Sequence, residues 1–162
     1  MDKPARKAYR LREYDYSSPG AYFITICTKN KEHLLWSKAV GASIARPHKP
    51  ELSPWGRVVE EAIHEIPEKY PAVNVDNYAV MPNHIHLLLT ISADESGRAM
   101  LAPTVSTVVQ QMKGAVSKKL GCSIWQKLFH DHVVRNLRDY EEIWNYIEDN
   151  PHRWTEDCFY IK

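Results

Sequence analysis

The segment 84–92 constrains the fold most strongly, because its side chains alternate in character over a full strand length. Successive side chains of a β-strand point to opposite faces of the sheet. One face therefore receives a continuous apolar row, which consists of Ile85, Leu87, Leu89 and Ile91. The other face receives His84 and His86. A chain with this segment needs a sheet with an apolar core on at least one side.

Further strands and three helices are predicted around this segment. Aromatic and β-branched residues favour strands over 21–28 and 73–80, segment 124–135 looks extended, and 34–40 can add a short strand. Helices are predicted over 53–67, with Ser53 as N-cap before Pro54, over 103–120, and over 138–150. The last helix must stop at Asn150, because Pro151 disfavours a helical residue before it.

The order of these elements predicts the fold class. Long connections between antiparallel strands indicate an α+β, ferredoxin-like antiparallel sheet of four to five strands with helices packed on one face. The 162 residues suit one domain over 1–162, with a basic N-terminal arm over 1–13. This length is too short for an amidohydrolase barrel, and the helices argue against a cupin, two other classes that use His-x-His.

Composition limits the setting and the partners. No apolar run is long enough to span a bilayer, and no secretory signal follows the basic N-terminus, so no membrane partner is expected. Cys27, Cys122 and Cys158 are too far apart for a disulfide framework or a zinc knuckle, which favours the reducing cytoplasm. The net charge is +1, which excludes a globally basic nucleic-acid coat but leaves room for a local basic patch.

Two His-x-His pairs are candidate metal sites. His84 and His86 share one strand face, where two imidazoles can bind one cation. His130 and His132 have the same spacing and enclose Asp131. Spacing alone does not decide which pair binds a metal. It also does not exclude the alternative that the histidines only hydrogen-bond to neighbouring strands.

The last helix carries a second candidate group. A buried stripe is predicted from helical spacing, and it consists of Tyr140, Ile143, Trp144 and Ile147. Tyr146 and Asn150 lie on a separate row, one turn apart. A tyrosine in this position is ordinarily a half-packed boundary residue, but a phenol beside an amide also offers a nucleophile next to a neutral oxygen ligand.

Together these segments resemble the HUH-superfamily single-tyrosine transposases and their REP-associated relatives. The resemblance covers about 10–154 and rests on four segments, which are YDYSSPGAYFITICT from Tyr14, VMPNHIHL from Val80, WQKLFHDHVVRN from Trp125 and YIEDNP from Tyr146. It implies a transposase, a single-strand DNA endonuclease and ligase that cleaves near hairpins through a 5′-phosphotyrosine intermediate.

The resemblance also implies roles for individual residues. His84, His86 and Asn150 would hold a divalent metal, Mg²⁺ or Mn²⁺, and Tyr146 would be the nucleophile. Asp131 and His132 would lie in the surroundings of the metal or contact DNA.

The expected partner is single-stranded or hairpin DNA in a bacterial cytoplasm, near the nucleoid, and related enzymes include both monomers and homodimers. The candidate phosphate contacts are Arg10, Arg12, Lys113 and Arg135. The alternative function is a DNA-binding protein that keeps the fold without cleavage.

Overall fold

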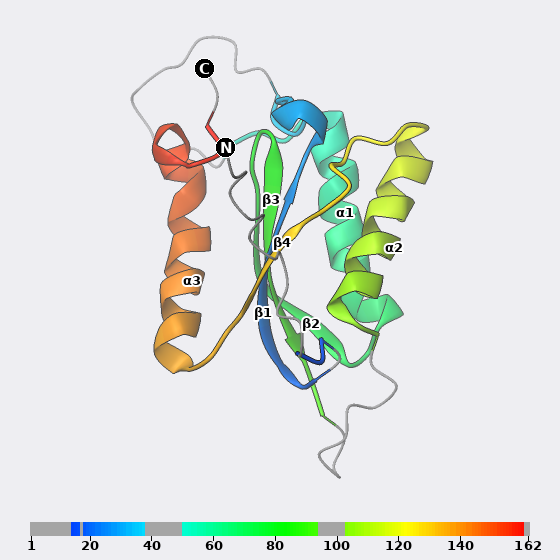
Figure 1. Cartoon of the computed structure of the whole chain (residues 1–162). Coiled ribbons are helices and arrows are strands. Elements are labelled where there is room, and N and C mark those ends of the chain that lie inside the picture. Colours follow the sequence, from blue (N-terminus) through cyan, green and yellow to red (C-terminus); the bar gives the residue numbers. More distant parts are fainter. Residues whose placement is uncertain (1–13, 17, 38–49, 94–102, 161–162) are drawn as a thin grey trace, which may run out of the picture.

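A computed structural model describes residues 14–16, 18–37, 50–93 and 103–160 (Figure 1). One antiparallel sheet contains four strands, β1 (Gly20–Cys27), β2 (Val73–Val80), β3 (His84–Ile91) and β4 (His130–Val133), in the order β2-β3-β1-β4. The helices are α1 (Pro54–Lys69), α2 (Val105–Leu120) and α3 (Leu137–Asp149), with short 3-10 helices η1 (Lys29–Lys31) and η2 (Asn150–Glu156). The succession βαββαβ with this strand order is the ferredoxin-like arrangement, so the predicted α+β class is confirmed.

The helix starts follow the capping residues in the sequence. Ser53 is the N-cap of α1, as predicted, and its hydroxyl accepts a hydrogen bond from the Gly56 N–H at 3.0 Å. Thr104 caps α2 and Asn136 caps α3 in the same way. After α3 the chain continues at Asn150 as the 3-10 helix η2.

Strands β1 and β3 form the centre of the sheet and fix the position of the histidines. β3 pairs with β1 on one side and with β2 on the other. The register places Thr25 opposite His86 and Cys27 opposite His84. Both histidines therefore lie inside the sheet and not at an exposed edge.

The sheet carries an apolar layer on each face. Helices α1 and α2 cover one face, where the predicted row from β3 joins a core that includes Ile24, Ile63 and Val109. Helix α3 lies on the other face (Figure 1), where Ile143 and Ile147 pack near Leu88. The expectation that the helices share one face therefore holds for α1 and α2, whereas α3 buries its stripe on the opposite side.

Several local expectations differ from the structure. Trp144, predicted in the buried stripe of α3, is 36% exposed. Within the described residues, the short strand expected over 34–40 is reduced to a single bridge between Trp36 and Leu52. Of the extended segment 124–135, His130–Val133 forms a strand of the sheet, and Trp125 adds a single bridge to Thr28. The arm 1–13, with Arg10 and Arg12, lies outside the described residues.

Candidate metal centre and nucleophile

His84 and His86 lie side by side on the sheet face that α3 covers. They are 0% and 1% exposed, and their Nε2 atoms are 3.0 Å apart. Adjacent ligands of an octahedral cation, each at roughly 2.1 Å, also stand about 3 Å apart. The separation of the two nitrogens therefore fits a shared cation.

Asn83 fixes the tautomer of His84. The Asn83 amide nitrogen donates to the carbonyl oxygens of Lys31, at 3.3 Å, and Phe159, at 2.9 Å. Its Oδ1 must then be the acceptor for the Nδ1–H of His84, at 2.8 Å. The lone pair of neutral His84 is consequently on Nε2, the atom that faces His86.

His86 has a comparable partner on the neighbouring strand. The hydroxyl of Thr25 lies 2.8 Å from its Nδ1, and both groups are buried. A hydroxyl can accept from Nδ1–H, which leaves Nε2 free as a ligand atom. Each imidazole is thus held through one nitrogen while the other nitrogens face each other.

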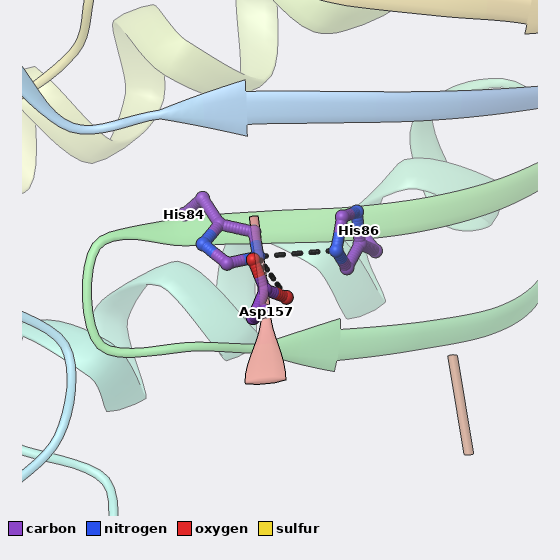
Figure 2. A group of neighbouring side chains, drawn as sticks. All are labelled: His84, His86 and Asp157. Atoms are coloured by element: carbon purple, nitrogen blue, oxygen red, sulfur yellow. Dashed lines mark hydrogen bonds and ion pairs between the residues drawn. The ribbon is translucent and has the colours of Figure 1, made fainter. Parts of the chain in front are cut away.

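Asp157 also reaches this site, a residue that sequence reasoning missed. Figure 2 shows its carboxylate beside the two rings, with Oδ2 3.6 Å from His84 Nε2. In the described part of the chain, one group of His, Cys, Asp and Glu side chains has its ligand atoms mutually within 4.8 Å, and it consists of His84, His86 and Asp157. This donor set fits a divalent cation.

The protonation states favour ligand binding. Burial lowers the pKa of His84, although Asp157 opposes the shift, and burial with the neighbouring His84 lowers the pKa of His86 strongly. Burial alone would raise the pKa of Asp157. His84 and the Phe159 N–H face the carboxylate oxygens and outweigh the effect of burial, so the pKa of Asp157 is lowered to about 2. The site therefore combines two neutral imidazoles with an ionised carboxylate at neutral pH.

Tyr146 lies next to His86 near the C-terminal end of α3, and Asn150 follows one turn later. The ring centroid of Tyr146 is 5.2 Å from that of His86, and the tyrosine is 42% exposed. Burial, with the nearby Asp157 carboxylate, raises the pKa of Tyr146 to about 12, while Asn150 works in the opposite direction. Asn150 is buried, and its amide nitrogen has no hydrogen-bond partner among the described residues.

The second His-x-His segment does not join this group. Asp131 pairs with Ile24, so it points to the face of α1 and α2, away from His84. His132 is on the same face as the histidines, but its Nε2 donates to Asp139 at 2.8 Å. The structure therefore brings neither Asp131 nor His132 to the candidate metal centre, and their alternative role in DNA contact stays a prediction.

The two described candidates for phosphate contacts differ from each other. The ammonium group of Lys113 donates to the carbonyl oxygens of Gln126, at 2.6 Å, and Lys127, at 3.3 Å. Burial lowers the pKa of Lys113. Lys113 therefore anchors the chain before β4, whereas Arg135 is exposed between β4 and α3.

Comparisons with known proteins show overall similarity to one group of transposases. No protein-family profile matches the chain. An uncharacterized protein of Haemophilus influenzae is 29% identical over 96% of this chain and 93% of its own length. The REP-associated tyrosine transposase of Escherichia coli is 23% identical over 87% of this chain and 73% of its own length. The chain is a relative of the REP-associated tyrosine transposases.

The relationship extends to the fold. A solved REP-associated tyrosine transposase, bound to a REP hairpin, aligns with a TM-score of 0.62 over 90% of this chain and 73% of its own, at 21% identity. This structural agreement supports the assignment of the chain to the ferredoxin-like fold. Among the helices that the structure describes, none combines the length and apolar character needed to cross a bilayer.

Proposed function

We propose that this transposase relative is a metal-dependent enzyme that cleaves and rejoins single-stranded DNA near hairpins, with Tyr146 as nucleophile. One observation carries the proposal. The Tyr146 ring lies against His86, whose Nε2 faces that of His84, so a phenol lies beside a preformed pair of metal-binding nitrogens. The similarity to REP-associated tyrosine transposases supports DNA as the substrate.

Each residue of the site has a separate proposed role in the reaction. His84 and His86 would hold a divalent cation, Mg²⁺ or Mn²⁺, and the Asn150 carbonyl oxygen would be a further ligand. When bound, the cation supplies charge stabilisation and polarisation at the scissile phosphate. Burial and the Asp157 carboxylate raise the pKa of Tyr146 to about 12, and Asn150, one turn away, acts in the opposite direction and partly offsets the cost of losing the phenol proton.

The proposed chemistry conserves the energy of the broken bond. The Tyr146 oxygen attacks phosphorus, the bond from phosphorus to the 3′ oxygen breaks, and the 3′ oxygen leaves as a hydroxyl after gaining a proton. The product is a 5′-phosphotyrosine. Attack of a 3′-hydroxyl on this ester releases the tyrosine and rejoins a strand, without ATP.

DNA contacts are proposed at four positively charged side chains. Arg135, which precedes α3, is exposed and available for a phosphate. Arg10 and Arg12 remain candidates in the arm outside the described residues. Lys113 is a weaker candidate, because its ammonium is already bound to backbone carbonyls.

One observation favours a second function, DNA binding without cleavage. The two histidines are buried beneath the chain that follows α3, so a phosphate reaches them only if that chain moves. A covalent-capture experiment separates the two functions. Purified protein is incubated with a hairpin-bearing single strand and Mn²⁺, and a denaturing gel is inspected for a protein–DNA adduct. An adduct supports cleavage, and retarded DNA on a native gel without an adduct supports binding alone.

A further inference from the structure

The chain after α3 packs directly on the candidate metal centre. The ring centroid of Phe159 is 4.7 Å from that of His84, and the ring centroid of Trp154 is 5.9 Å from it. The carbonyl oxygen of Phe159 accepts a hydrogen bond from Asn83, the residue that fixes the His84 tautomer. Segment 154–160, named the covering segment below, is therefore tied to the histidine side of the sheet.

Asp157 lies within the covering segment, and its two oxygens have different surroundings. Oδ1 accepts a hydrogen bond from the Phe159 N–H at 2.7 Å. Oδ2 is buried and has no hydrogen-bond partner among the described residues. The side chain as a whole is 0% exposed. A buried carboxylate oxygen without a partner is costly, so its position calls for a positively charged group.

The direction of this oxygen identifies the missing partner. Oδ2 lies 3.6 Å from Nε2 of His84, on the side where the His86 nitrogen also converges (Figure 2). Two neutral imidazoles cannot neutralise a carboxylate, whereas a divalent cation among three such donors can. Carboxylate oxygen is the ligand that Mg²⁺ and Mn²⁺ prefer, and imidazole is tolerated by Mn²⁺.

We propose that Asp157 is a ligand of the cation, and that metal binding fastens the covering segment across His84 and His86. The inference rests on the metal site of the proposed function and adds to it a ligand from another part of the chain. The strand β3 supplies two donors and the covering segment supplies the third. The cation would therefore join two segments that are far apart in sequence.

The first test measures metal affinity with the full chain. Isothermal titration calorimetry with Mn²⁺ compares the wild type with Asp157→Asn, which preserves shape but removes the charge. Glu156→Gln is the matched control, because Glu156 is exposed and pairs with Arg153. We expect the Kd for Mn²⁺ to rise about ten-fold or more in Asp157→Asn and to stay unchanged in Glu156→Gln.

The second test measures whether metal binding protects the backbone amides of the covering segment from hydrogen exchange. Hydrogen exchange of the backbone amides in 157–160 is expected to slow when Mn²⁺ is added to the wild type, and to be insensitive to Mn²⁺ in Asp157→Asn. Asp157→Ser retains an oxygen that can accept from the Phe159 N–H, so it is a second variant that should fold and show the same loss. Near-ultraviolet circular dichroism verifies the packing of each variant.

The outcomes distinguish this inference from the proposed function. If the Asp157 variants bind Mn²⁺ as tightly as the wild type while His84→Ala does not, Asp157 is not a ligand and the histidine site stands. If the wild type binds no Mn²⁺, both the inference and the proposed metal site are wrong. Mn²⁺ binding that needs Asp157 but does not slow exchange in 157–160 would refute the fastening of the segment.

Discussion

The hydroxyl of Thr25 lies 2.8 Å from Nδ1 of His86, across the pair of strands at the centre of the sheet. This contact orients the imidazole so that Nε2 faces His84. Partners of this kind fix the orientation and tautomer of metal-binding histidines, and their loss typically weakens metal binding roughly 10- to 100-fold. A buried hydroxyl beside the site therefore has a measurable role in metal affinity.

Thr25→Val tests this role, because it replaces the hydroxyl by a methyl group of similar size. We expect the Kd for Mn²⁺ to rise about ten-fold, since His86 loses the partner that holds its ring. Thr25→Ser keeps the hydroxyl and should bind Mn²⁺ nearly as the wild type does. Calorimetric titration of the three proteins gives the comparison. Equal affinities of Thr25→Val and Thr25→Ser would show that the contact does not position the ring.

His86→Ala is expected to abolish the increase in melting temperature that Mn²⁺ gives the wild type. The substitution also leaves a small cavity and an unpaired Thr25 hydroxyl, so the metal-free variant should lose about 1–3 kcal/mol of stability. His130→Ala is the control, because His130 lies outside the converging group. Thermal unfolding with and without Mn²⁺ measures both effects. Loss of the Mn²⁺ effect in His130→Ala alone would assign the metal to the other His-x-His pair.

The strands and the main core could be predicted from the sequence because their patterns depend on local geometry. Alternation along β3 placed Ile85 and Leu87 in the core and the histidines on the opposite face, as the structure has them. The N-cap at Ser53 is likewise a local contact. These features need no knowledge of distant partners.

The position of α3 depends on information that periodicity lacks. Helical spacing defines an apolar stripe but does not say which surface the stripe covers. One signal was available, since Leu88 shares a face with His84 and His86 and indicates a second apolar surface. Asp157 had no such signal, because it approaches His84 only through the packing of the covering segment. The bonds of Lys113 to two carbonyls are tertiary contacts of the same kind.

Tyr140 is expected to make the stability of the protein depend on alkaline pH. Burial, with the hydrogen bond to Asp76 at 2.9 Å, raises the pKa of Tyr140 to about 12 from 10.0. A pKa raised in the folded state gives stability that is complete below pH 10.0 and is lost as pH rises through about 12. Tyr140→Phe should therefore show a smaller loss of unfolding free energy over this interval. Urea unfolding at the two ends of this pH interval measures the loss in both proteins. An equal pH dependence of the wild type and Tyr140→Phe would contradict the prediction.

Arg135 and Lys113 are expected to respond differently in DNA binding. Arg135→Gln should lower the salt dependence of hairpin binding by about one counterion, because one phosphate contact is lost. Lys113→Gln should leave that slope unchanged and reduce thermal stability, since its ammonium binds backbone carbonyls. Fluorescence anisotropy at several salt concentrations measures the slope. A reduced slope in Lys113→Gln with a normal slope in Arg135→Gln would reverse the two assignments.

The nucleophile is tested most directly by mapping the covalent adduct. Protein incubated with a hairpin-bearing single strand and Mn²⁺ is digested, and the peptide that carries the nucleotide is identified by mass spectrometry. Tyr146→Phe removes one oxygen and almost no volume, so the fold should persist, and Tyr140→Phe is the matched control on the same helix. We predict an adduct on Tyr146 in the wild type and in Tyr140→Phe, and none in Tyr146→Phe. An adduct on Tyr140 or Tyr78, or one that persists in Tyr146→Phe, would contradict the proposed mechanism.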